Sequence, residues 1–378
     1  MKILLWAPLG AGTHYWGPGI SAFNLYSTET DFEFSLSVAH GYKHHDVYSL
    51  YRDQYFISPL NRNSRIPLCS FLWRSKKWIR SNAKAFDAVH VLGDHIRSFL
   101  PALWFEQEGV PAFIKPVGAD GGLSLSSKIA KFSGWKKFKL AHVNNITGYI
   151  SISSRISQDL LSINVSPGKI HNIPNGVNCD RFFSVSEERK RALRKELNLD
   201  NAFTVIFSGS IEQRKNPSVV VRAFESFGEE PGIQLIIIGP VRDGGYEMKK
   251  IEQAIKSGVS VKVHVVPFTP SVEKYYMASD VFILPSSNEG LSNSLLEAQA
   301  CGLPALVTKV SGSEDLIKEG HNGIYVLPDE ADIASKITYY FSNPDMVRQH
   351  GRNARLNVCN HHSSKVILEK HLNLFKNA

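Results

Sequence analysis

Short apolar runs rich in β-branched residues alternate along this chain with longer stretches whose apolar residues recur at helical spacing. Such alternation predicts βαβ units, in which strands pair in parallel and helices cover the sheet. In the first half we expect strands at Lys2–Trp6, Glu33–Val38, Ala88–Leu92, Ala112–Val117 and Tyr149–Ile152. In the second half we expect them at Phe203–Phe207, Gln234–Ile238, Val261–Val265, Val281–Leu284 and Ala305–Val307. The pattern predicts an α/β protein with parallel sheets.

Helical stretches follow most of these strands, for example Pro217–Phe227 and Leu291–Ala300. Proline suits the first position of a helix, because its fixed φ is helical and its missing N–H is not needed there. No strand pattern crosses the region from about 177 to 200, so we expect a first domain at 1–177 and a second at 178–342. The last residues, about 343–378, read as helices that can pack back on the first domain.

Composition narrows the class of protein. The 378 residues are 43% hydrophobic and 11% aromatic, which suffices for a sizeable core and excludes a disordered or fibrous chain. The four cysteines are scattered without the spacing of a disulfide framework or a zinc site, which favours a reducing cytosol. No apolar run approaches the ~18 residues of a membrane helix. The first residues read as a strand running into a loop rather than a signal peptide.

The net charge of +8 is concentrated in the first half, where residues 1–180 carry +7. Two segments, 71–84 and 128–140, each hold five Lys or Arg and no acidic residue, with tryptophan and phenylalanine interleaved. Basic and aromatic residues in this arrangement suit the anionic interface of a membrane. The alternative is a solvated charged face whose aromatic residues belong to the core. Nucleic acid is the other acidic partner, but no nucleic-acid-binding motif supports it, so we expect none.

The most informative stretch is EGLSNSLLEAQACGLPALV, residues 289–307, which follows the expected strand Val281–Leu284. Gly290 places Glu289 in a loop, whereas Glu297 falls inside the helix that Ser292, Asn293 and Ser294 head. A strand, a loop and a helix N-terminus together offer backbone N–H groups and a positive dipole end to an anion. The alternative is a pair of solvated glutamates on a surface helix, which the flanking residues disfavour.

A second stretch, FSGSIEQRKNP at residues 207–217, follows the first strand of the second domain and opens a helix. Gly209 permits close approach of the backbone to a ligand. Arg214 and Lys215 stand at the carboxyl end of a parallel strand, where ligands bind in such sheets, and two cations there can hold a diphosphate. The alternative is a solvated Arg-Lys turn.

Both stretches, in their order and spacing, resemble glycosyltransferase family 4, the retaining group 1 glycosyl transferases with the GT-B fold. The resemblance runs from Phe203 to about Leu327. It also includes IPNGV (173–177), IIIG (236–239), the GLP turn (302–304) and GSEDLIKEGHNGIYV (312–326). It implies two Rossmann-like domains that face each other across a cleft.

The resemblance also implies roles for single residues. Arg214 and Lys215 would bind the donor diphosphate and stabilise the charge of the leaving group, with Glu289 at the transferred sugar; these three are the expected catalytic residues. Glu297 would bind the nucleotide ribose. The remaining donor contacts are expected from Gly209, Gly290, Leu291, Ser292, Asn293, Ser294 and Leu295. No D-x-D triplet occurs, and the cations can serve the diphosphate, so we expect neither a metal nor another cofactor.

The first half matches this family more loosely. A glycine-rich stretch, Gly10–Gly19, occupies the place of the family's loop after the first strand, and Gly12, Gly17 and Gly19 are weak candidates for the acceptor side. Val117 stands where the family has a histidine that contacts the sugar, so that role is lost or moved.

Three nearby residues are further weak candidates for the acceptor side, namely Asp94, His95 and Asp120. For each of them a helix cap or a solvated loop residue is the alternative.

We therefore expect a retaining, hexosyl-type glycosyltransferase that uses a nucleotide sugar and a carbohydrate acceptor. The basic segments favour a lipid-linked acceptor at the cytoplasmic face of a membrane, as in surface polysaccharide or lipopolysaccharide synthesis. The alternatives are a soluble acceptor, or a nucleotide-sugar-binding protein that has lost turnover, which Val117 motivates. A two-domain dehydrogenase would need a GxGxxG after a strand, and the sequence has none.

Overall fold

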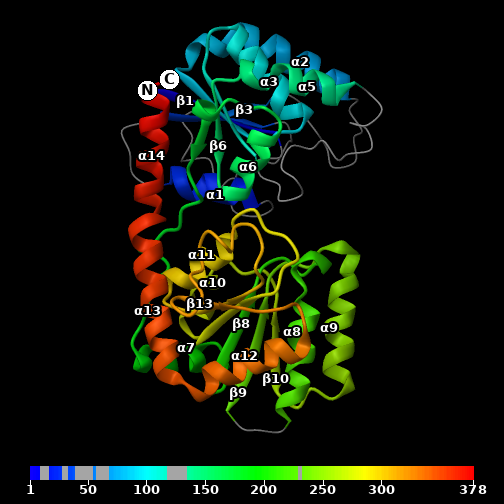
Figure 1. Cartoon of the computed structure of the whole chain (residues 1–378), viewed down its shortest axis with the longest axis vertical. Helices are drawn as coiled ribbons and strands as arrows, with labels where there is room; N and C mark the ends of the chain where they lie inside the picture. Colours follow the sequence, from blue (N-terminus) through cyan, green and yellow to red (C-terminus); the bar gives the residue numbers. More distant parts are fainter. Residues whose placement is uncertain (9–16, 28–32, 39–53, 57–67, 117–133, 229–231) are drawn as a thin grey trace. The chain divides into compact units, whose positions relative to one another are not determined.

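The structure is a computed structural model of the chain, coloured along the sequence in Figure 1. It describes all residues except 9–16, 28–32, 39–53, 57–67, 117–133 and 229–231. The chain divides into two compact units: unit 1 comprises Met1–Gly176 with Ser364–Ala378, and unit 2 comprises Val177–Ser363. Each unit is built around its own parallel sheet.

The sheet of unit 1 has the strand order β3-β2-β1-β4-β5-β6-β7. Its strands are β1 (Lys2–Ala7), β2 (Glu33–Val38), β3 (Gln54–Phe56), β4 (Ala88–Leu92), β5 (Ala112–Lys115), β6 (Gly148–Ser151) and β7 (Ile170–Asn172). Its helices are α1 (Gly17–Tyr26), α2 (Leu68–Asn82), α3 (Ile96–Gln107), α5 (Trp135–His142), α6 (Ser154–Ser162) and α14 (Ser364–Lys376). The buried core joins Ile3 and Leu5 of β1 to Ile367 and Phe375 of α14.

The sheet of unit 2 has the order β10-β9-β8-β11-β12-β13. All its strands are parallel, and the order in which the chain adds them switches from one side of β8 to the other between β10 and β11. Its strands are β8 (Phe203–Ser208), β9 (Ile233–Ile238), β10 (Lys262–Val266), β11 (Val281–Leu284), β12 (Ala305–Val307) and β13 (Gly323–Tyr325). Its helices are α7 (Glu187–Glu196), α8 (Pro217–Ala223), α9 (Tyr246–Ser257), α10 (Val272–Met277), α11 (Asn293–Ala300), α12 (Glu330–Ser342) and α13 (Pro344–His361). In open sheets of this type ligands bind at the carboxyl ends of the strands, at the point where this order switches.

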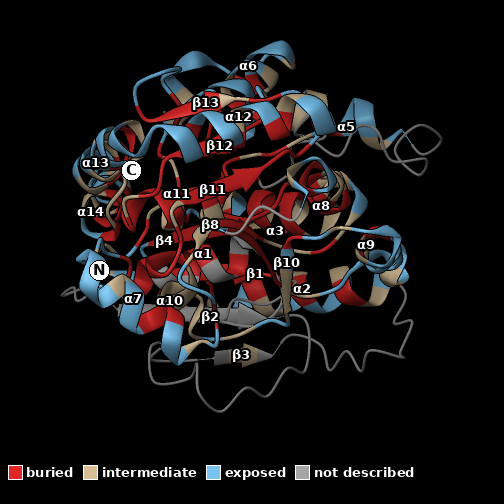
Figure 2. Cartoon of the chain, turned by 90° about the horizontal axis from the view of Figure 1, so that it is seen from below, coloured by how far each residue is buried: buried red, intermediate tan, exposed pale blue. Residues whose placement is uncertain are grey.

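The central strands lie where unbroken apolar runs predicted them. Both faces of these strands are covered, so apolar residues are buried on both faces. β11 is buried along its whole length, and β8 is buried from Thr204 onward (Figure 2). Three strands were not expected, namely β3, β7 and β13, each of three residues. So short a strand gives no periodic signal, and β12, which is equally short, was expected only from its unbroken apolar run Ala305–Val307.

The helical segment that returns to unit 1 is shorter than the expected 343–378. Only α14 belongs to unit 1, whereas α13 belongs to unit 2. The physical reason is close packing between α13 and the turn after α11: a Cβ on Gly351 would lie 2.0 Å from the carbonyl oxygen of Gly302.

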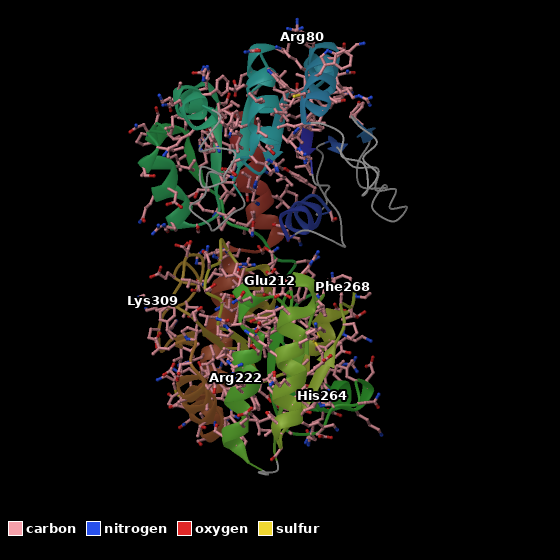
Figure 3. All side chains as sticks on the ribbon, turned by 90° about the vertical axis from the view of Figure 1, so that its right-hand side faces the viewer. Arg80, Glu212, Arg222, His264, Phe268 and Lys309 are labelled. Atoms are coloured by element: carbon pink, nitrogen blue, oxygen red, sulfur yellow. The ribbon has the colours of Figure 1, made fainter. Side chains whose placement is uncertain are left out.

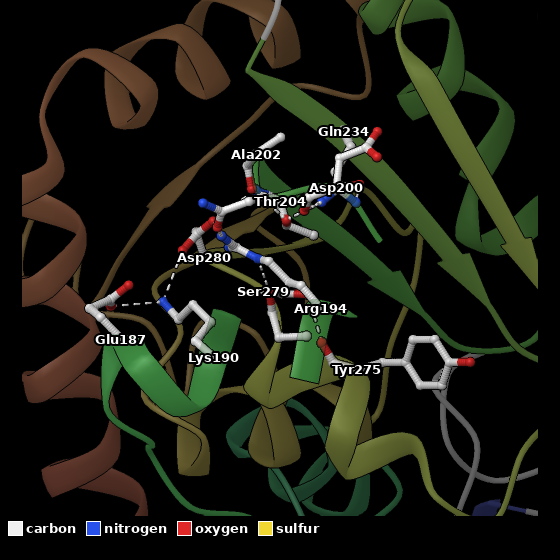
Figure 4. A network of polar contacts seen from close by, with 12 residues as sticks. Glu187, Lys190, Arg194, Asp200, Ala202, Thr204, Gln234, Tyr275, Ser279 and Asp280 are labelled. Carbon is white, nitrogen blue, oxygen red and sulfur yellow. Dashed lines mark hydrogen bonds and ion pairs between the residues drawn. The ribbon is translucent and has the colours of Figure 1, made fainter. Parts of the chain in front are cut away.

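A charged network at the amino-terminal edge of the unit-2 sheet holds α7 against it (Figure 4). The carboxylate of Asp280 accepts from Arg194 at 2.6 Å and from Lys190 at 2.9 Å. It also accepts from the backbone N–H of Thr204 at 2.8 Å. Every charge in this network has a partner within the fold, so it is structural.

Candidate functional site

Three charged side chains meet at the carboxyl edge of the unit-2 sheet. The ammonium nitrogen of Lys215 lies 3.1 Å from Oε1 of Glu289, and a guanidinium nitrogen of Arg214 lies 3.2 Å from the same oxygen. The side chains of Lys215 and Glu289 are 10% and 11% exposed, whereas that of Arg214 is 39% exposed. The cluster is therefore mostly dry but open to solvent on the side of Arg214.

Two glycines bring the backbone close to this cluster. Gly209 directly follows β8 with φ +152°, and a Cβ there would lie 3.0 Å from the ammonium nitrogen of Lys215. Gly239, at the end of β9, has φ +148°, and a Cβ there would lie 1.9 Å from the carbonyl oxygen of Gly209. Both positions favour glycine: the backbone conformation strains any other residue at each of them, and at Gly239 the backbone also leaves no space for a Cβ.

Lys215 and Arg214 come from a single 3₁₀ turn, Gln213–Lys215, which ends at Asn216 in the left-handed region before Pro217 opens α8. The loop after β11 is fastened to this turn, since the backbone N–H of Ser287 donates to the carbonyl oxygen of Arg214 at 2.9 Å. The hydroxyl of Ser286 donates to Glu289 at 2.8 Å. The two loops thus position the cations and the carboxylate as one assembly.

Electrostatics keep the Glu289 carboxylate and the Arg214 guanidinium ionised. Burial alone would raise the pKa of the Glu289 carboxyl, but Lys215 and Arg214 outweigh burial and hold that pKa below its ordinary value. Burial alone would lower the pKa of Arg214, but the carboxylates of Glu289 and Glu212 outweigh it and raise that pKa. Glu212 contacts the guanidinium at 2.9 Å. In Figure 3, Glu212 and Phe268 mark this end of unit 2, while Arg222 and His264 lie farther from it.

The second glutamate lies apart from the ion-pair cluster. Ser292 caps α11 by accepting from the N–H of Leu295, so the helix begins two residues later than the expected Leu291. Glu297 lies within α11, half-buried, and accepts from the hydroxyl of Tyr276 at 3.2 Å. Desolvation raises the pKa of the Glu297 carboxyl to about 7, although the Tyr276 hydrogen bond acts in the opposite direction.

The structure thus brings together Arg214, Lys215 and Glu289 and places Gly209 against Lys215, while Gly290, Leu291 and the first turn of α11 continue from Glu289. Sequence reasoning did not single out Glu212, Ser286 or Tyr276. Glu212 was within the quoted stretch of residues 207–217, but its direction depends on the 3₁₀ turn. Ser286 and Tyr276 carry no sequence signal.

The described acceptor-side candidates of unit 1 lie in a helix or have partners within the fold. Gly17 and Gly19 lie in the first turn of α1 rather than in a loop, because the helix begins at Gly17. The carboxylate of Asp94 pairs with the fully buried ammonium of Lys139 at 3.0 Å, so it has a structural partner. His95 shares a hydrogen bond of 2.9 Å with the hydroxyl of Ser98.

The other acceptor-side candidates, Gly12 and Asp120, lie outside the described residues, as does Val117. Among the residues that the structure describes, no three His, Cys, Asp or Glu side chains cluster closely enough to hold a metal ion. That the reaction needs neither a metal nor another cofactor stays a prediction. No helix in the described part of the chain has the length and apolar character to cross a membrane.

Comparison with known proteins agrees with this geometry. Residues 189–357 match the family model of glycosyl transferases group 1. A D-inositol 3-phosphate glycosyltransferase of Segniliparus rotundus is 32% identical over 196 residues, which are 49% of this chain and 42% of that relative. The chain spans about half the length or less of the first curated relatives that it matches.

Two solved structures share the fold of this chain. HepE of Anabaena, in complex with UDP and glucose, superposes with a TM-score of 0.81 and 16% identity over 100% of both chains. A glycosyltransferase from Rickettsia africae gives 0.82 and 18% identity over 100% of this chain and 98% of that one. At such identities these likenesses establish the fold, which is GT-B. Within the chain, residues 189–357 match the group 1 glycosyltransferase domain, and the rest of the chain lies outside that match.

Proposed function

We propose that this protein is a retaining glycosyltransferase that moves a hexosyl group from a nucleotide sugar to a carbohydrate acceptor. The observation that carries the proposal is the convergence of Lys215 and Arg214 on Glu289 at the carboxyl ends of β8 and β11. A diphosphate needs two adjacent cations, and a sugar hydroxyl needs a carboxylate acceptor next to them. The family match and the fold support the same activity.

The ion pairs suggest how the donor engages the site. Glu289 supplies a negative charge that faces both cations. A bound diphosphate supplies that charge instead, which leaves the Glu289 carboxylate to accept hydrogen bonds from the transferred sugar. As the glycosidic bond breaks, negative charge builds on the diphosphate, and the prepositioned Lys215 and Arg214 stabilise it without rearrangement.

Glu297 serves as the ribose acceptor in this proposal, and the leaving phosphate takes the proton of the acceptor hydroxyl on the same face of the sugar. That route requires no side-chain base, so it tolerates Val117 in place of the family histidine. The stereochemistry is directly testable: the product retains the anomeric configuration of the donor. A product with inverted configuration would overturn the retaining mechanism.

Exposed aromatic and basic side chains of unit 1 support a lipid-linked acceptor. Trp73 of α2 is 66% exposed, and the ammonium of Lys77 lies 5.7 Å from the centre of its ring. On α5, Phe138 is 38% exposed beside the exposed Lys136 and Lys137. Exposed aromatic rings next to cations favour the anionic surface of a membrane, so we place the protein peripherally at the cytoplasmic face, in surface polysaccharide synthesis.

The activity is tested with purified protein and a panel of nucleotide sugars. UDP-sugars come first, because the HepE structure holds UDP. A bound donor raises the melting temperature in proportion to occupancy, and a labelled donor reports hydrolysis or transfer. Transfer to a lipid-linked but not to a free sugar supports the proposed acceptor, and transfer to the free sugar alone supports the soluble alternative. Binding without any turnover, over a full panel of acceptors, would identify a binding protein instead.

A further inference from the structure

Two cysteines that are 180 positions apart in the sequence meet in unit 2. The sulfur atoms of Cys179 and Cys359 lie 2.8 Å apart. Both residues are partly exposed, whereas Cys69 is exposed and Cys301 is buried, and all four thiols are free. The pair is therefore in contact with each other and within reach of small molecules from solvent.

The backbone on both sides of the pair is already fixed. The N–H of Val177 donates to the carbonyl oxygen of His362 at 2.9 Å, and Val177 and Ser363 form a parallel bridge. The side-chain oxygen of Asn178 accepts from the N–H groups of Asp180 and Arg181 at 2.9 and 3.0 Å, which shapes the turn that carries Cys179.

The helix that carries Cys359 is held to the same turn. One helical turn before this cysteine, Arg355 donates to the carbonyl oxygen of Phe182 at 3.2 Å. A covalent S–S bond is shorter than the present separation by less than 1 Å. The sulfur atoms therefore need only a small approach, and the fold supplies the rest of the geometry.

We propose that Cys179 and Cys359 form a reversible disulfide by exchange with a low-molecular-weight disulfide such as oxidised glutathione. Both cysteines lie just inside unit 2, next to the two points at which the chain passes between the units, 176–177 and 363–364. The bond would join the two ends of unit 2 to each other. In a reducing compartment the pair stays as two thiols, so the proposal is compatible with the scattered cysteines of the sequence.

The exchange takes two steps. The thiolate of one cysteine of the pair bonds to one sulfur of the outer disulfide and expels the other sulfur as a thiolate. The second cysteine of the pair loses its proton to that thiolate, attacks the sulfur of the first cysteine and expels the second outer thiolate. Two protein thiols are oxidised and one outer disulfide is reduced to two thiols.

The expected consequence is a more stable unit 2. A link between residues 179 and 359 closes nearly the whole unit into one loop, which removes much of the freedom of its unfolded chain. We expect the melting temperature of the transition that includes unit 2 to rise by about 5–10 °C on oxidation and to fall back when the thiols are restored.

The experiment incubates the full-length protein with oxidised glutathione, blocks remaining thiols and maps tryptic peptides without reduction. We expect a linked pair of the peptides Ile170–Arg181 and Leu356–Lys365, which disappears after treatment with dithiothreitol. Cys69→Ser is the control, because it removes the exposed thiol and leaves the pair intact. In Cys179→Ser we expect Cys359 to stop at the mixed disulfide with glutathione.

Several results would overturn the proposal. One is that the two peptides stay unlinked in the wild-type protein while Cys69 becomes glutathionylated, since the reagent has then reached the protein without forming the bond. Another is that Cys179 and Cys359 each carry their own glutathione. A melting temperature that rises equally in Cys179→Ser would show that the stabilisation does not come from this bond.

Discussion

The ammonium of Lys215 lies 3.1 Å from the carboxylate of Glu289, and the two residues come from loops that follow different strands, β8 and β11. The pair links the two loops and balances the charge of a buried cation. In the proposed binding mode a donor diphosphate competes with Glu289 for this cation. We therefore expect binding and catalysis to respond in opposite directions to removal of the carboxylate.

Substitution Glu289→Gln separates these two effects. Without the carboxylate, Lys215 and Arg214 have less negative charge facing them, so we expect UDP to bind about fivefold more tightly, the equivalent of about 1 kcal/mol. Transfer is expected to fall at least about 100-fold, because the contact with the sugar is lost. Calorimetry and an initial-rate assay measure the two quantities. Glu330→Gln, which alters an exposed glutamate paired with Arg222, should leave both unchanged. Weaker UDP binding in Glu289→Gln would contradict the competition.

Substitution Glu297→Gln tests the carboxyl group whose pKa is raised. The pKa is about 7 in the folded state against 4.5 ordinarily, so the folded protein holds a proton that the unfolded chain releases between these values. Stability is therefore lost as pH rises from 4.5 to 7, by about 3 kcal/mol in full. We expect Glu297→Gln to melt higher than the wild type at pH 8 and nearly alike at pH 4.5, while binding UDP more weakly. A variant that is less stable than the wild type at pH 8 would show that the carboxylate is not strained there.

Replacing either of two buried lysines of unit 1 is expected to change the stability of the protein, in opposite directions for the two lysines. Lys115 is 2% exposed, and desolvation lowers its pKa from 10.5 to about 8. The unfolded chain binds the proton more tightly, so the penalty is complete below pH 8 and disappears as pH rises through 10.5. Lys115→Met should gain about 3 kcal/mol of stability at pH 7. Lys139→Met should instead lose about 3–5 kcal/mol, because it strands the buried Asp94 carboxylate without its partner. Denaturant unfolding at pH 7 measures the stability of both variants. A change in the same direction in both variants would contradict these predictions.

Flotation with anionic vesicles tests the membrane surface. The neutralised set is Lys76, Lys77, Lys136 and Lys137, and the matched control set in unit 2 is Lys195, Lys249, Lys256 and Lys318. Each lysine near an anionic surface contributes about 1 kcal/mol, so we expect the first variant to lose binding at least about 100-fold and the second to keep it. Binding that survives in the first variant would show that these helices do not face the membrane.

The sequence determined more of the fold than of the site. The central strands were predictable because a strand covered on both faces reads as an unbroken apolar run, as at Val281–Leu284. Arg214, Lys215 and the two glutamates were predictable because their order and spacing match a known family. The pairing of Arg214 with Glu212 was not, because it depends on a 3₁₀ turn. The contact between Cys179 and Cys359 was not either, since 180 residues separate them and only tertiary packing brings them together.

The most direct test of the central claim measures UDP binding by calorimetry in Lys215→Met. Its matched control is Lys262→Met, which alters an exposed lysine at the amino end of β10 that pairs with Asp200. If Lys215 holds the donor diphosphate, its loss removes a charge-assisted contact worth about 1.5–3 kcal/mol, and the affinity for UDP falls about 10- to 100-fold while the control keeps the wild-type value. Equal affinity in Lys215→Met, in the wild type and in the control would contradict the claim that this cluster binds the nucleotide sugar.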